Sequence, residues 1–209
     1  MKNFLAKSAL VTIILIPGGA DAGSAMKLSG DAFAPPAFYV FCSRETWLCR
    51  TGGGMETVVV GPREASELSR VNVAVNARIR ERSDRANVGK DDDWRLPAKY
   101  GDCEDFAIAK KRELLKRGWP ASALLLTVAR LRGSGHTVST VRTSEGDLVL
   151  DNQTNAVRDW SRTPYIYLAR QSQSDGSRWE LIEGRGWFGV QAPPNTAANA
   201  NSRASRAYK

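Results

Sequence analysis

The sequence has few of the residues that hold metal ions through nitrogen and sulfur. Its 209 residues include one histidine, His136, and three cysteines, none of which forms a Cys-x-x-Cys pair. A structural zinc site needs four such ligands, usually in a few recurrent spacings. The sequence therefore argues against a structural zinc site.

After the N-terminus, the sequence also lacks any apolar run long enough to span a bilayer, which takes about 20 residues. Two lysines near the N-terminus precede a short apolar stretch, residues 9–16, and Ala20-Asp21-Ala22 then fits the A-x-A pattern read by signal peptidase. We interpret residues 1–22 as a cleaved secretory signal; a cut after Ala25 and an uncleaved anchor are the alternatives. These features predict a periplasmic or secreted protein with no transmembrane segment in the mature chain.

Acidic residues are outnumbered by basic ones, 22 Asp and Glu against 30 Lys and Arg, so the formal net charge is +8. A positive surface can attract nucleic acid or an anionic envelope surface. The basic residues are scattered along the chain, however, and do not alternate with aromatic residues as in a groove for single-stranded nucleic acid. We therefore predict no nucleic-acid partner.

The odd number of cysteines is informative because the predicted export places the chain in an oxidising compartment. Cys42 and Cys49 lie close together, and a disulfide between them would close a small loop. Cys103 is then left over. An unpaired cysteine in an exported protein is a candidate for a reactive thiol.

The order of hydrophobic patterns predicts an α+β fold. Leu68, Val71, Val75 and Ile79 share one helical face within residues 64–82. A second helix is predicted over residues 103–117, ending before a glycine. Apolar and β-branched runs predict strands over residues 123–131, 136–143, 147–150, 165–169 and 179–182. Helices followed by sequential strands are typical of helices packed on an antiparallel sheet.

The composition divides the chain into four parts. After the signal over residues 1–22, residues 23–55 are rich in Gly, Pro and Ser. We expect this segment to wrap the surface of the domain and to be held there by the predicted disulfide. Residues 56–190 form the main domain, in which the polar stretch 83–100 reads as a loop. Residues 191–209 contain mostly Ala, Asn, Ser and Arg and read as a disordered tail.

The position of Cys103 suits a nucleophile. It opens the predicted helix after Asp102, a good N-cap residue, and the positive end of a helix dipole favours a thiolate. The same N–H groups could bind an oxyanion. The carboxylates of Asp102, Glu104 and Asp105 oppose the thiolate unless something neutralises them. A buried structural cysteine is the alternative reading.

His136 and Asp151 are the candidate partners of this thiol. Imidazole is the side chain best suited to take a proton from a thiol near neutral pH. His136 begins a predicted strand, and Asp151 ends the next one across the turn at residues 144–146. The ends of a hairpin come together, so the carboxylate could orient the imidazole. Taken singly, the histidine could be structural and the aspartate a turn residue.

Three segments carry a resemblance to a known family. They are Gly-Asp-Cys-Glu-Asp-Phe-Ala-Ile-Ala-Lys, Gly-His-Thr-Val and Val-Leu-Asp-Asn, with Asp92-Asp93-Trp94 and Pro97 upstream. With these motifs, residues 38–185 resemble the bacterial transglutaminase-like cysteine proteinases, of which the LapG-type periplasmic proteases are the best known. The resemblance implies a papain-like transglutaminase core, in which the cysteine-bearing helix packs on an antiparallel sheet. It also implies Cys103 as nucleophile, His136 as general base and acid, and Asp151 as the orienting group.

The resemblance also implies a metal ion, a substrate class and a regulatory partner. LapG-type proteases need calcium, cut surface adhesins to release biofilm cells, and are held by an inner-membrane receptor. Their calcium ligands would correspond to Asp102 and Glu104, and Ca²⁺ would cancel the charge beside the thiolate. Helix capping is the alternative role for these carboxylates. Further acidic residues that the spacing does not rank are Asp91, Asp92, Asp93 and Asp105.

Two features separate the chain from the adhesin-cleaving members. Phe106 stands where family members often carry tyrosine, and those proteases do not require the segment with Cys42 and Cys49. Because a fold does not transfer a substrate, the leading hypothesis is coarser: an exported cysteine protease that cleaves a peptide bond in an envelope or surface protein. The alternatives are transglutaminase-type acyl transfer to an amine and a catalytically silent interaction module.

Overall fold

The fold is built on a seven-stranded sheet in the order β1-β9-β8-β4-β5-β6-β7, and every pairing in it is antiparallel. The computed structural model describes residues 23–52, 54 and 57–183. The strands are β1 (Leu28–Ala32), β4 (Leu124–Leu131), β5 (Ser134–Thr143), β6 (Gly146–Leu150), β7 (Arg158–Asp159), β8 (Ile166–Gln171) and β9 (Trp179–Ile182). This architecture confirms the predicted α+β class with an antiparallel sheet.

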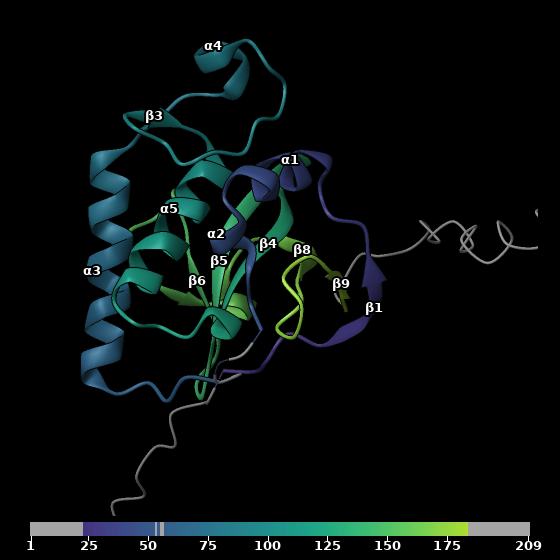
Figure 1. Cartoon of the computed structure of the whole chain (residues 1–209). Helices are drawn as coiled ribbons and strands as arrows, with labels where there is room; N and C mark the ends of the chain where they lie inside the picture. The colour runs from purple at the N-terminus through teal and green to yellow at the C-terminus, as the bar shows by residue number, and fades with distance from the viewer. Residues whose placement is uncertain (1–22, 53, 55–56, 184–209) are drawn as a thin grey trace, which may run out of the picture.

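The helices form a layer against this sheet (Figure 1). They are α1 (Pro36–Arg44), α2 (Thr46–Cys49), α3 (Pro62–Arg78), α4 (Asp84–Val88) and α5 (Cys103–Lys116). Helix α5 packs against β4 and β5 on one side and against α3 on the other. The short strands β2 (Arg80–Glu81) and β3 (Tyr100–Gly101) pair in parallel beside α4. The start of α5 therefore lies at the α4 end of the molecule.

Helix α3 buries the face that its sequence predicts. Leu68, Val71, Val75 and Ile79 are all buried in one core cluster with side chains from α5 and the sheet. The helix begins and ends slightly earlier than expected. Pro62 is a favourable first residue, and the Glu64 carboxylate accepts a hydrogen bond from the Gly61 N–H, at 3.0 Å. At the other end, the chain leaves the helix to form β2.

Helix α5 is buried around most of its circumference because it lies between two layers. Phe106 and Leu114 join the cluster shared with α3, whereas Ile108 packs into a second cluster with α1 and β9. The helix ends at Lys116, and Gly118 follows with a φ of 84°, a conformation that glycine adopts easily. This tight packing fixes the position of the first residue, Cys103.

The N-terminal segment departs from the expectation that it wraps the surface. Strand β1 joins the sheet beside β9, and α1 buries Phe38 and Phe41. The ring of Phe38 packs edge-on against Trp94 and Trp179, with ring centroids 5.7 and 5.2 Å away. Such aromatic contacts bury large apolar areas. The segment therefore contributes to the core rather than only covering it.

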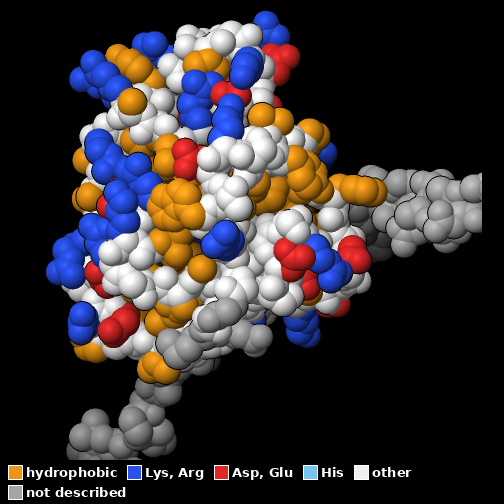
Figure 2. All heavy atoms as spheres, in the orientation of Figure 1, with side chains coloured by type: hydrophobic (Ala, Val, Ile, Leu, Met, Phe, Trp, Pro, Cys, Tyr) orange, Lys and Arg blue, Asp and Glu red, His pale blue; other side chains and the backbone are white. Residues whose placement is uncertain are grey.

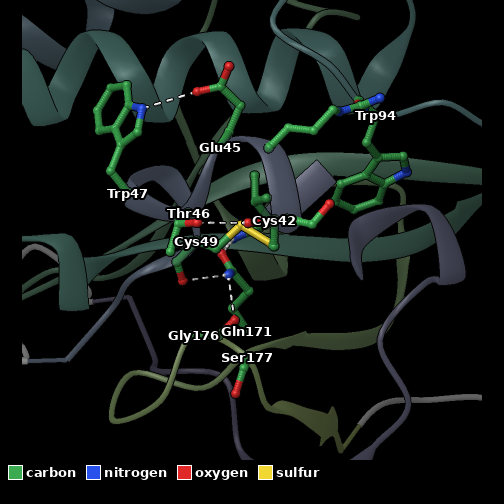
Figure 3. Close-up of a disulfide and its surroundings, with 12 residues drawn as sticks. Cys42, Glu45, Thr46, Trp47, Cys49, Trp94, Gln171, Gly176 and Ser177 are labelled. Atoms are coloured by element: carbon green, nitrogen blue, oxygen red, sulfur yellow. Dashed lines mark hydrogen bonds between the residues drawn. A yellow bond between two sulfur atoms is a disulfide. The ribbon is translucent and has the colours of Figure 1, made fainter. Parts of the chain in front are cut away.

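The expected disulfide between Cys42 and Cys49 is present and ties α1 to α2 (Figure 3). A loop of this length stabilises the fold by about 2.5 kcal/mol in the chain-entropy treatment. Gln171 of β8 donates hydrogen bonds to the carbonyls of Cys49 and Gly176 and accepts one from the buried ammonium of Lys111. The disulfide is thus linked through Gln171 to α5.

The stretch over residues 83–100 is not purely a loop, because α4 and the first residue of β3 form within it. Helix α4 ends at Gly89, which has a φ of 74°. The predicted secretory signal, residues 1–22, and the predicted tail, residues 191–209, lie outside the described residues.

On one face of the molecule, the basic side chains lie mainly toward α4 and α3 (Figure 2). On the face shown in Figure 2, Lys and Arg side chains extend from the α4 end along the α3 side, with acidic and uncharged side chains between them. Within the part of the chain that the structure describes, no helix is both long and apolar enough to cross a membrane.

Candidate active site

The three predicted catalytic residues come from three different elements. Cys103 is the first residue of α5, His136 lies in β5, and Asp151 directly follows β6. Cys103 and His136 line a common cleft of about 370 Å³, together with Trp94 from the loop before α5. Asp151 is buried and in contact with His136.

The hairpin of β5 and β6 brings His136 and Asp151 together, as the sequence predicts. Its register pairs Ser139 with Leu150, so Asp151 continues past the end of the ladder toward His136. The imidazole Nε2 and the carboxylate Oδ1 are 2.9 Å apart, and both side chains are buried. With Nε2 bonded to the carboxylate, the other ring nitrogen, Nδ1, is left for a partner elsewhere.

Asp151 is held by further donors. Its Oδ1 accepts a hydrogen bond from the Gln153 N–H at 3.2 Å, and its Oδ2 accepts one from the Tyr165 hydroxyl. Burial raises the pKa of Asp151, but the hydrogen bonds from His136 and Tyr165 outweigh it, so the pKa lies below the usual value. The carboxylate is therefore ionised at neutral pH. Nothing in the local sequence pointed to Tyr165.

The Cys103 thiol is half-buried and free. Its sulfur accepts a hydrogen bond from the backbone N–H of Thr137, the neighbour of His136, which joins α5 to β5. It also lies 3.4 Å from Oε2 of Glu104. Burial, followed by the charge of Glu104, raises the pKa of Cys103 well above its usual value, although the Thr137 N–H opposes the shift. Burial and the nearby carboxylates thus oppose a thiolate at Cys103, and neutralisation of those carboxylates would favour it.

An acidic cluster provides the setting for that neutralisation. Asp84, Asp102 and Glu104 each place a carboxylate oxygen within 4.8 Å of the others. Burial, followed by the hydrogen bond that protonated Glu104 donates to Asp102, raises the pKa of Glu104 to about 10. One oxygen each of Asp84 and Asp102 is buried without a hydrogen-bond partner among the residues that the structure describes. Hard cations such as Ca²⁺ prefer several such oxygens, so these three residues fit a cation.

Asp84 is absent from the sequence prediction, which selected Asp102 and Glu104. It opens α4, within the stretch expected to be a loop, and its backbone N–H donates to Asp102 Oδ2 at 2.9 Å, a contact over 18 residues. Asp102 does occupy the N-cap position of α5, but its side chain makes no capping hydrogen bond there. Helix capping alone therefore does not account for this carboxylate.

The other acidic candidates have different partners. Asp105 accepts a hydrogen bond from the Arg95 N–H, and Asp92 accepts one from the Trp94 indole. Asp93 pairs with Lys90 and Arg95, whereas the exposed Asp91 pairs with Arg85. These four aspartates therefore have partners outside the cluster of Asp84, Asp102 and Glu104, although the backbone N–H of Asp93 donates to Oδ2 of Asp84.

A helix that begins at a cysteine and packs on an antiparallel sheet carrying histidine defines a transglutaminase-like fold with a thiol in its cleft. The model of the bacterial transglutaminase-like cysteine proteinases matches residues 28–186. Because this match covers most of the chain, the protein belongs to that family. It is a cysteine peptidase, and its substrate is a protein.

Solved structures of LapG from Legionella pneumophila are also similar. The calcium-bound form is 26% identical, over 64% of this chain and 77% of that chain, with a TM-score of 0.49. Another LapG structure is 23% identical, over 73% of this chain and 83% of that chain, with a TM-score of 0.49. An EGTA-treated form is 23% identical, over 75% of this chain and 83% of that chain, with a TM-score of 0.48. The family assignment rests on the family model and not on these superpositions. No curated protein matches the sequence.

Proposed function

We propose that the protein is an exported protease that cleaves a peptide bond in a cell-envelope or surface protein, with Cys103, His136 and Asp151 as its catalytic triad. The observation that supports this most is the hydrogen bond of 2.9 Å between His136 and Asp151 beside a cleft that also contains the Cys103 thiol. Adhesins, the substrates of the LapG-type proteases that the sequence resembles, are the first proteins to test.

In the proposed reaction, Nδ1 of His136 takes the proton of the Cys103 thiol, and the thiolate attacks the peptide carbonyl carbon. The negative charge moves to the carbonyl oxygen, for which backbone N–H groups at the start of α5 are the candidate donors. The imidazolium then gives its proton to the leaving amine as the C–N bond breaks. Water, deprotonated by the same imidazole, releases the acyl group and restores the thiol. Asp151 stabilises the imidazolium throughout.

We propose Ca²⁺ as the cation of the acidic cluster, held by Asp84, Asp102 and Glu104. The cluster lies beside Cys103 and contains buried carboxylate oxygens with no hydrogen-bond partner in the described part of the chain. A bound cation would supply positive charge that cancels the carboxylates next to the thiol. The role of this chain's own residues would be to bring two ligands from the start of α5 and one from α4 into contact, and so to fix α4 against α5.

Calcium is expected to raise the melting temperature of the purified protein by several degrees, because a ligand present at about 100 times its Kd stabilises a fold by about 2.7 kcal/mol. Burial raises the pKa of Glu104 to about 10, so binding must displace a proton, and the shift should be larger at about pH 8 than at about pH 6. Thermal unfolding with calcium or with EGTA measures this. Asp84→Asn should lose the shift.

Asp91→Asn is the matched control for this prediction. Asp91 lines the same cleft but is exposed and paired with Arg85, outside the cluster. The Asp91→Asn variant should keep the full calcium shift. An equal shift in the Asp84→Asn and wild-type proteins would contradict the assignment of Asp84 as a ligand.

The proposed location is the periplasm or the cell exterior, on the basis of the signal-like residues 1–22. An inner-membrane receptor is the regulatory partner that the family resemblance suggests. Both proposals can be tested by fractionating cells that express the full chain and by capturing cross-linked partners from the envelope fraction. Recovery of the mature chain in the cytosol would contradict the proposed export.

The proposed function is tested by mapping new protein N-termini in an isolated cell-envelope fraction treated with the wild-type protein or with Cys103→Ala. Peptide-bond hydrolysis produces N-termini that appear only with the wild-type protein. Supplying a labelled primary amine separates hydrolysis from acyl transfer, since transfer would attach the label to glutamine side chains instead. New N-termini in equal number with Cys103→Ala would rule out the proposal.

A further inference from the structure

Tyr165 contacts both members of the His136–Asp151 pair. It immediately precedes β8, and its hydroxyl donates a hydrogen bond to Oδ2 of Asp151. Its ring lies 5.0 Å, centroid to centroid, from the imidazole of His136, at an interplanar angle of 47°. The steps of the proposed reaction use Asp151 and His136 but assign nothing to this third side chain.

The hydroxyl of Tyr165 is a fixed donor. Burial and the neighbouring Asp151 carboxylate raise the pKa of Tyr165 well above its usual value, so the hydroxyl keeps its proton. The ring of Tyr165 packs edge-on against the ring of Tyr167, with the ring centroids 6.0 Å apart and an interplanar angle of 83°. This support comes from the ring of Tyr167, whereas the Tyr167 hydroxyl bonds to Oγ1 of Thr163, 2.8 Å away. The packing against Tyr167 therefore fixes the position from which the Tyr165 hydroxyl donates to Asp151.

The donors around Asp151 divide between its two oxygens. Oδ1 accepts from His136 and from the Gln153 N–H, whereas Oδ2 accepts from Tyr165. The buried ammonium of Lys110 on α5 attracts Asp151 electrostatically, but its Nζ has no hydrogen-bond partner among the described residues. A charge without a hydrogen bond does not orient a carboxylate plane, so Tyr165 is the side chain that fixes Oδ2.

We propose that Tyr165 is a positioning residue, which fixes the plane of the Asp151 carboxylate and the tilt of the His136 ring so that Nδ1 faces Cys103. This inference rests on the proposed function of the triad. The hydroxyl anchors Oδ2, which keeps Oδ1 directed at Nε2, and the ring supports one face of the imidazole. Without the hydroxyl, the carboxylate can rotate and the imidazole loses its preferred tautomer for part of the time.

The first readout is the alkylation rate of Cys103 by iodoacetamide at about pH 7 with calcium present, which needs no knowledge of the natural substrate. Tyr165→Phe keeps the ring and removes only the hydroxyl. We expect the rate to fall about 10- to 100-fold, as for a lost hydrogen bond to a charged group. Tyr167→Phe is the matched control, since it removes the neighbouring hydroxyl that bonds to Thr163, and it should stay within about threefold of the wild type.

The second readout is the imidazole N–H signal of His136 in NMR. Because the chain has one histidine, protein labelled with ¹⁵N-histidine and purified without a histidine tag gives a single ring. We expect the Nε2–H signal to shift and its proton to exchange with water about tenfold faster in Tyr165→Phe but not in Tyr167→Phe. A merely structural hydroxyl would lower the melting temperature and leave this signal in place.

Tyr165→Phe could also be less stable than the wild type. A double-mutant cycle with Asp151→Asn, measured below the melting temperatures of all variants, separates the positioning effect from such a loss of stability. If Tyr165 acts through Asp151, removing its hydroxyl from Asp151→Asn should cost less than about twofold further in alkylation rate. Additive losses, or an unchanged signal and rate in Tyr165→Phe, would overturn the proposal. If the alkylation rate of His136→Ala equals that of the wild type, the proposed triad is wrong. In that case, the NMR signal of His136 still shows whether Tyr165 positions the imidazole ring.

Discussion

Cys103→Ala is expected to lower the kcat/KM for any peptide substrate by about 10⁴-fold or more, as when the nucleophile of a catalytic triad is removed. The thiol is the nucleophile of the proposed reaction, and no neighbouring side chain can replace it. Glu104, the closest carboxylate, is a calcium ligand in the proposed active state, and without the ion burial raises its pKa to about 10, which keeps it protonated. The measurement is the rate of cleavage of a peptide taken from a mapped site.

The other two cysteines provide the control for this substitution. Cys42 and Cys49 form a disulfide that lies apart from the cleft of Cys103 and His136. Replacing both with serine should lower the melting temperature but leave kcat/KM within about threefold of the wild type at low temperature, because the disulfide acts on stability. Hydrolysis that persists in Cys103→Ala and disappears in the double variant would reverse the assignment of the nucleophile.

Asp151→Asn has the second largest expected effect, a decrease in kcat of about 10²- to 10⁴-fold. The carboxylate accepts a hydrogen bond from the Nε2–H of His136 and so keeps Nδ1 unprotonated and able to take the thiol proton. An asparagine can instead donate to Nε2, which favours the tautomer with its proton on Nδ1, where it blocks the base. Since the substrate is not held by Asp151, KM should change little. Steady-state kinetics on the same peptide measure both quantities.

Asp175→Asn is a suitable control, since this exposed carboxylate bonds to Ser177 outside the Cys103–His136 cleft. Its kcat should equal that of the wild type. If Asp151→Asn also retained its kcat, His136 would not depend on the carboxylate, and the third member of the triad would have to be sought elsewhere.

The features that the sequence predicted well depend on short-range order. The apolar periodicity of α3 is visible within the helix, which buries the expected side chains, and α5 begins and ends close to the residues that its capping signals predict. The contact between His136 and Asp151 was predictable because both lie on one hairpin with a short turn. In these cases, the relevant geometry is fixed within about 15 residues of chain, so pattern and turn chemistry suffice.

The features that the sequence did not predict depend on contacts between distant segments. Asp84 reaches the cluster because α4 folds back onto the start of α5, and no periodicity in a short polar stretch encodes that. Tyr165 reaches Asp151 because β8 pairs with β4, and β4 in turn pairs with β5, the strand that carries His136. Strand β1, with the sequence Leu-Ser-Gly-Asp-Ala, has no apolar alternation and is recruited by pairing with β9. Tertiary pairing overrides weak local propensity at each position.

The central claim is that Cys103 becomes a thiolate nucleophile through His136, once the carboxylates beside it are neutralised. The direct measurement is the rate of Cys103 alkylation against pH for the disulfide-intact protein, with calcium or EGTA, compared with His136→Ala. Burial and Glu104 raise the pKa of the thiol, so the midpoint with EGTA should lie above about 8.5, the value of free cysteine. With calcium, the midpoint is expected to lie clearly below the free-cysteine value. His136→Ala should abolish this downward shift. A thiol that titrates like free cysteine with calcium present, or that ignores the loss of His136, would contradict the account.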